Sequence, residues 1–444
     1  MFFTLIGQSD SSQVWGRMVG TTMAALLLIA PQAAFAQTVT NFETPPVLRV
    51  TDLVPEQLLQ GKGFQVEEKV PTDGVMGTYT IKAEAKTFHE DAGTYQVRSC
   101  ELLELRLSEI PAIVKLDEVS KTGVFAKSLA ASAARPLESA GNMVLHPVGT
   151  VTGLPSGVGR LFDRVETGAG SLWNSATAPG ESGLERTGDI AARTGTITRD
   201  ALGYEQERRD LAKKLGVDPY TSNPILAKKL DEIAWVSFAA RLAVSTAISV
   251  AVPGSMIITG LTTTDNLVWD TPRGDLIVRV ETKLQEMNVP REQISAFSHN
   301  PAIPLSLQVA VVENLSRLAE VPGRGDVVVL MSSVMMESQA RFLATSVRML
   351  AAYHEKQKPI TAVAAPGPLV GRDQEGALIL PAPVDYVSWT ERVAQFAQSS
   401  TLAAPQRSIW LTGKISPRAS KEMTKLGWML QDVGRLRPSQ PSGR

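Results

Sequence analysis

The densest group of side chains able to do chemistry lies near the end of the chain. Asp385, Tyr386 and Trp389 follow one another closely in the stretch PAPVDYVSWTE. A carboxylate beside aromatic rings on a loop can line a site for a sugar or a peptide. The same aromatic residues can instead anchor a hydrophobic core, with a helix cap beside them, and this interpretation is the one we favour.

A hydrolase site assembled from distant residues is an alternative, and Asp385 and His354 are its first candidates. The familiar catalytic motifs do not support it, because the sequence contains no GxSxG, HExxH or GxGxxG motif. Its nearest approach to a Walker motif, GKIS at 413–416, has Ser408 where the first glycine should stand. The four histidines are too far apart in the sequence to suggest metal ligands. We therefore predict no metal site, no cofactor and no catalytic residues.

The elements that must position these residues form a small α/β module over 325–434. DVVVLMSSV (326–334) is typical of a strand and SQARFLATSVRMLAAYHE of a helix. GALILPAPVDYV is extended, and its prolines favour an edge strand or a loop. Ser388 and Glu391 fit a capping box that opens the next helix. A strand, a turn and a helix follow, with Ser416 as the cap, Pro417 at the first helical position and Gly427 at the end.

Residues 37–118 predict a β-rich domain. GKGFQVEEKVP, GTYTIKAEAK and GTYQVRSCELLELRL are extended runs separated by the turn signals TDG and HEDAG, as in a meander or hairpin. Cys100 lies in the third run, where we expect it to be buried and structural. Because it is the only cysteine, the chain forms no internal disulfide.

Helices are predicted over 204–324. YEQERRDLAKKLG stops at Gly216, and we expect its charges to form a solvated helix face. The next helix begins with Asn223 as a candidate cap and Pro224 at its first position. Before this region, 119–203 is a connector rich in Ala, Gly and Ser that contains a predicted amphipathic helix, 151–165. With a disordered tail at 435–444, the chain is predicted to be α+β: a β-rich start, a helical centre and an α/β end.

Residues 1–36 have the pattern of a signal peptide. The short apolar block MAALLLIA follows Arg17, and Ala34 and Ala36 supply the small residues of a cleavage site before Gln37. The stretch before Arg17 is long for such a leader, so translation from Met18 is an alternative to Met1. The sequence thus predicts a periplasmic or secreted protein.

The run 242–262, LAVSTAISVAVPGSMIITGLT, carries no charged residue and could either cross a membrane or enter a protein core. Its hydroxyl-bearing residues and the central Pro253-Gly254 weaken a membrane helix, so we favour the core. Peripheral contact with lipid through 151–165 or 242–262 remains an alternative. Lys plus Arg (44) nearly balances Asp plus Glu (45), which disfavours a nucleic-acid binder.

Three hypotheses of function follow. The favoured one is an exported, non-catalytic binding or scaffold protein of a bacterial-type cell envelope, with an unknown protein or envelope component as its partner. The second is an envelope protein that touches a membrane. The third is the hydrolase that would use Asp385 and His354. The sequence leaves the ligand and the oligomeric state open.

Overall fold

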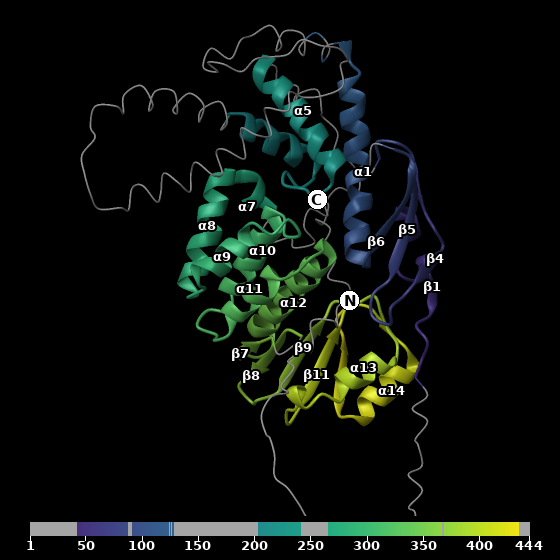
Figure 1. Ribbon diagram of the computed structural model, residues 1–444, viewed down its shortest axis with the longest axis vertical. Helices are drawn as coiled ribbons and strands as arrows, with labels where there is room; N and C mark the ends of the chain where they lie inside the picture. Colours follow the sequence, from purple (N-terminus) through teal and green to yellow (C-terminus); the bar gives the residue numbers. More distant parts are fainter. Residues whose placement is uncertain are drawn as a thin grey trace, which may run out of the picture.

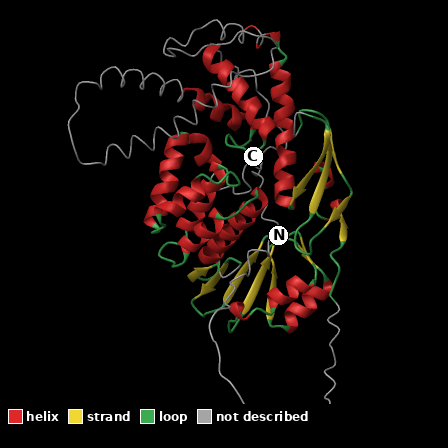
Figure 2. Cartoon of the chain, viewed as in Figure 1, coloured by secondary structure: helices red, strands yellow, loops and turns green. Residues whose placement is uncertain are grey.

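The protein has an α+β fold, as predicted (Figures 1 and 2). The computed structural model describes residues 42–87, 91–123, 125, 127, 203–240, 265–365 and 368–434. In Figure 1 an N-terminal sheet lies beside the long helix α1 (Cys100–Ser120), a group of helices within 265–356 (α7–α12) lies on the other side, and a second sheet lies below them.

The N-terminal sheet is antiparallel, in the order β2-β3-β5-β6, and a separate pair is formed by β1 and β4. In β5 the side chains of Tyr79, Ile81 and Ala83 are buried and alternate with more exposed ones, which confirms a strand with one solvent-exposed face. β5 and β6 are antiparallel neighbours, as a meander requires. The strands are β1 (Val47–Arg49), β2 (Gln60–Gly61), β3 (Phe64–Val66), β4 (Lys69–Pro71), β5 (Thr78–Ala83) and β6 (Gly93–Arg98), with short 3-10 turns at Val50–Asp52 and Glu56–Leu58.

The predicted third strand is half wrong, because it ends at Arg98 and α1 (Cys100–Ser120) follows at once. Ser99 turns the chain with a positive φ of 75°, and its hydroxyl accepts a hydrogen bond from the amide of Leu102 as the helix cap. The apolar run then buries residues three and four apart, Leu103, Leu107 and Ile110, against the N-terminal sheet. A short apolar run does not distinguish strand from helix, and here the cap decides.

The helical region begins with a helix at 203–215, and Asn223 caps the next one through hydrogen bonds from the amides of Ile225 and Leu226. The strand predicted at 326–334 is wrong, because this segment forms α11. Val327, Val328 and Met331 are buried on one side of α11 while Val329 is exposed, so helix packing overrides the β propensity of the valines. The helices are α5 (Pro224–Ala240), α7 (Asp265–Asp270), α8 (Arg273–Glu286), α9 (Arg291–Ser298), α10 (Leu305–Ser316), α11 (Arg324–Ser332) and α12 (Glu337–Lys356).

The C-terminal sheet has the order β13-β11-β9-β8-β7, and β9, β11 and β13 are parallel. α12 packs against β7 and β9, and α14 packs against β13. The elements are β7 (Ile360–Ala364), β8 (Val370–Asp373), β9 (Leu378–Ala382), β10 (Tyr386–Val387), α13 (Glu391–Ala397), a 3-10 turn (Ser400–Leu402), β11 (Arg407–Leu411), β12 (Lys414–Ile415), α14 (Pro417–Lys425) and β13 (Trp428–Asp432).

Two expectations for this module need correction. The segment with prolines is not at an edge, because β9 is the central strand; its ladder to β8 ends at Ile379, so Pro381 lies beyond it. The cap of α13 is Thr390 and not Ser388, since the Thr390 hydroxyl accepts from the amide of Val393. The predicted cap of α14 by Ser416 is confirmed.

Several predicted segments lie outside the described residues: the leader 1–36, the amphipathic helix 151–165, the uncharged run 242–262 and the tail 435–444. Within the residues that are described, no helix is both long enough and apolar enough to cross a membrane.

Candidate functional site

Asp385 is buried and connects the C-terminal module to N-terminal segments that are distant in the sequence. Its carboxylate accepts hydrogen bonds from the amide of Gly77 (Oδ2, 2.9 Å) and from the amide of Cys100 (Oδ1, 3.0 Å). Cys100 is the first residue of α1, so the carboxylate also faces the positive end of that helix. Asp385 therefore joins the C-terminal module to the N-terminal sheet and to α1.

The two aromatic residues of the predicted group lie in the same region of contact between the N-terminal segment and the C-terminal module. Trp389 is buried in the core of the C-terminal module, and its amide donates to Glu43 Oε2 at 2.5 Å. The amide of Tyr386 donates to the carbonyl of Val75, and its side chain is only half buried. Trp389 is thus a core anchor, and Tyr386 lies where the N-terminal segment crosses the module.

His354 is held by its own partner. It lies in the last turn of α12, where its Nδ1 accepts a hydrogen bond of 2.9 Å from the amide of Ile360 at the start of β7. The structure thus gives His354 and Asp385 separate partners on separate elements, and these contacts provide no acid–base pair for a hydrolase.

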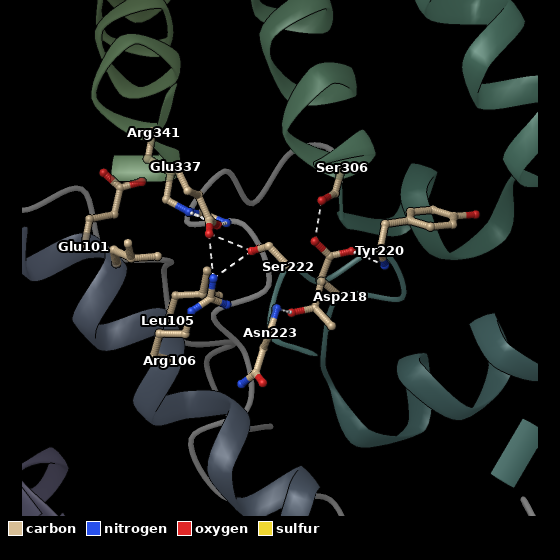
Figure 3. Close-up of polar contacts among 12 residues, drawn as sticks. Glu101, Leu105, Arg106, Asp218, Tyr220, Ser222, Asn223, Ser306, Glu337 and Arg341 are labelled. Carbon is tan, nitrogen blue, oxygen red and sulfur yellow. Dashed lines mark hydrogen bonds and ion pairs between the residues drawn. The ribbon is translucent and has the colours of Figure 1, made fainter. Parts of the chain in front are cut away.

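A second polar cluster, which the sequence did not indicate, lies where α1, α12 and the loop before α5 meet (Figure 3). We call it the buried junction; its charged members are Arg106, Glu109, Glu337 and Arg341. Glu337 is its centre: Oε2 is 2.5 Å from Arg106 Nη2, and Oε1 is 2.8 Å from Arg341 Nη2. The hydroxyl of Ser222 also donates to Glu337 Oε2 at 2.6 Å.

Glu109 is the most buried acid of the junction, with 2% of its surface exposed. Arg106 Nη1 lies 3.0 Å from its Oε2, and the amide group of Asn223 donates to the same oxygen at 2.9 Å. The hydroxyl of Thr221 donates to its other oxygen, Oε1. Two arginines thus pair with two glutamates. Neutral donors from the 221–223 loop fill further hydrogen-bonding positions on the two carboxylates, as buried ion pairs require.

The pKa of Glu337 shows that its charge is compensated. Burial alone would raise it, but Arg341 and Arg106, together with the hydroxyl of Ser222, hold the pKa of Glu337 below its usual range. For Arg106, burial acts to lower the pKa, and Glu109 and Glu337 outweigh it. Glu337 and Arg106 therefore keep their charges at neutral pH.

Asp218 lies beside the junction and differs from it (Figure 3). It accepts hydrogen bonds from the hydroxyl of Ser306 and from the amide of Tyr220. Burial is the largest influence on this carboxyl and raises its pKa to about 6, since the two neutral donors and the charge of Arg341 offset the desolvation only in part.

Asp218 should make stability depend on pH. A carboxyl whose pKa rises from 3.8 to about 6 on folding stabilises the protein fully below about pH 4, and this contribution is lost as the pH rises through about 6. Asp218→Asn does not titrate, so its unfolding free energy should fall less steeply over this window. Urea titrations across about pH 4 to 7 measure the slope. Asp52→Asn, at an exposed position, is the control, and a slope in Asp218→Asn equal to that of the parent would contradict the assignment.

The signals for the junction are visible in the sequence only as ordinary local pairs. Arg106 and Glu109 are three residues apart on one helix, and Glu337 and Arg341 are four apart on another. Such pairs are usually solvated, and nothing local marks these as buried. Among the described residues, no group of three or more His, Cys, Asp or Glu side chains could hold a metal ion.

Comparisons with protein-family models, with curated proteins and with solved structures found no match to this chain.

Proposed function

We propose that this chain is an exported, non-catalytic scaffold or binding protein of a bacterial-type cell envelope, located in the periplasm or secreted. Its partner would be a protein or another envelope component. The near balance of acidic and basic residues supports neither a nucleic acid nor a strongly charged surface as the partner.

The observation that carries this proposal is that the buried carboxylate of Asp385 is fully engaged in structural hydrogen bonds. A buried carboxylate is a strong candidate for acid–base chemistry when its pKa is perturbed and its oxygens face a cleft. Here both oxygens are bonded to backbone amides of distant segments. Glu109 and Glu337 are likewise bonded across elements. These contacts hold three parts of the chain in one arrangement, which suits a scaffold that presents a surface.

Export is supported by the leader pattern of 1–36. N-terminal sequencing of protein from the native host should give Gln37 as the first residue, in the periplasmic or culture fraction. Ala36→Leu should block this processing, because the peptidase needs a small residue there, whereas Phe35→Leu should leave it unchanged. A chain that keeps residues 18–36 and stays in the cytoplasm would refute the proposal.

Alkaline carbonate extraction of membranes distinguishes a membrane-attached chain from an envelope protein that is not attached. We expect the mature chain in the supernatant, since the sequence 242–262 contains Pro253-Gly254 and several Ser and Thr residues, which weaken the pattern of a membrane helix. Retention in the pellet until detergent is added would instead assign the chain to the membrane through 242–262 or 151–165.

A further inference from the structure

A third polar cluster lies on the helix at 203–215, whose charges were expected to be solvated. That expectation is wrong for one face, because Glu205 and Arg209 are 8% and 7% exposed, and Arg208 is also largely buried. Tyr220, 6% exposed, reaches the same place from the loop before α5. Figure 3 shows its ring turned away from Arg106 and Glu337, so the cluster is distinct from the buried junction.

The cluster gathers buried polar atoms that no hydrogen bond satisfies. In the part of the chain that the structure describes, five of the ten such side-chain atoms belong to it: Glu205 Oε2, Arg208 Nε, Arg209 Nε, Arg209 Nη1 and Tyr220 OH. Arg208 Nε lies 2.8 Å from Asp231 Oδ1 as an ion pair, although its N–H is not aligned for a hydrogen bond. Buried donors without acceptors cost free energy, so their concentration at one place calls for an explanation.

The charges around these atoms leave a positive excess. Three arginines meet here, since the guanidinium of Arg273 lies 5.8 Å from the centre of the Tyr220 ring, and they face the acids Glu205 and Asp231. Asp231 is already engaged, by Arg208 and by the hydroxyl of Tyr204 at 2.6 Å. Among the residues that the structure describes, these three positive and two negative groups, each counted as charged, give a net charge of +1.

We propose that Arg208, Arg209 and Tyr220 bind the oxyanion of a small ligand that carries a phosphate or a carboxylate. Guanidinium and phenol groups are donors that suit such an anion. Arg209 and Tyr220 find in it the acceptor that the protein does not provide, and Arg208 adds its positive charge beside them. Both the Nε and the Nη1 of Arg209 lack an acceptor, and each can donate a charge-assisted hydrogen bond to a ligand oxygen.

Glu205 opposes an anion, as Asp231 does, but among the described residues it makes no ion pair or hydrogen bond that would offset its charge as Arg208 offsets that of Asp231. Burial raises its pKa, against the lowering effect of Arg208, Arg273 and Arg209. When it is protonated it becomes a donor, and the positive excess of the cluster grows by one. The inference concerns a site of its own and does not depend on export or on the scaffold role.

Calorimetric titration of the purified full-length chain tests this site, with inorganic phosphate and acetate as probes and chloride at matched ionic strength as the blank. We expect saturable binding of phosphate, of acetate or of both; the stronger probe identifies the anionic group of the ligand. Arg209→Gln should weaken binding by about tenfold or more, since it removes a charge-assisted bond. Tyr220→Phe should weaken it severalfold while keeping the ring.

The matched control is Arg317→Gln, which removes an arginine from the Glu355 ion pair elsewhere and should leave binding unchanged. The site is refuted if neither probe binds above the chloride blank. It is equally refuted if Tyr220→Phe and Arg209→Gln bind as the parent does. Should Arg209→Gln fail to fold, Tyr220→Phe decides alone, because it removes a single oxygen.

Discussion

Replacing Glu337 with alanine is expected to lower the free energy of unfolding by about 3–5 kcal/mol. The change leaves Arg106 and Arg341 facing each other without the carboxylate that now lies between them. Both arginine side chains are mostly buried, at 12% and 3% exposed, so water cannot replace the lost partner well. Urea-induced unfolding followed by circular dichroism measures the effect.

The control for this prediction is Glu375→Ala. Glu375 pairs with Lys358 at the surface, where an ion pair contributes about 0–1 kcal/mol. If Glu337→Ala destabilises the protein no more than Glu375→Ala does, the ion pairs of the buried junction do not contribute to stability as argued. Replacing Arg106 and Glu337 together completes a double-mutant cycle that isolates their coupling.

Asp385→Ala is expected to cost about 2–6 kcal/mol of stability, because it leaves two buried amides without an acceptor at about 1–3 kcal/mol each. The amides are those of Gly77 and Cys100, on segments far from Asp385 in the sequence. The effect should be local as well as global. Hydrogen exchange at these two amides should accelerate more than exchange in the C-terminal sheet.

Asp385→Asn supplies a graded comparison, since an amide group keeps one of the two acceptor oxygens. Its loss of stability should be smaller than that of Asp385→Ala. The matched surface control is Asp52→Ala, which removes an exposed partner of Arg49. Unchanged exchange at Gly77 and Cys100 in Asp385→Ala would show that Asp385 does not hold these segments.

Local patterns predicted the elements whose signals are chemical and short in range. Asn223 and Ser416 cap their helices as expected, and the alternation in β5 is confirmed. Cap residues and alternating side chains act within a few positions of the chain, so they can be read without the fold. Apolar runs failed more often, as the segments at 101–107 and 326–334 show. Such runs indicate that a segment is buried, but they do not show whether it forms a helix or a strand.

The roles of the polar residues were decided by tertiary structure. Asp385 stood out in the sequence as a candidate ligand-binding residue, yet its partners Gly77 and Cys100 come from the other end of the chain. Nothing near Arg209 or Glu337 in the sequence marks them as largely buried, or shows that Glu337 pairs with Arg106 on another helix. By itself the sequence determined the fold class and that a single cysteine can form no internal disulfide. Only packing decided which charges lose their water, because desolvation depends on neighbours distant in the chain.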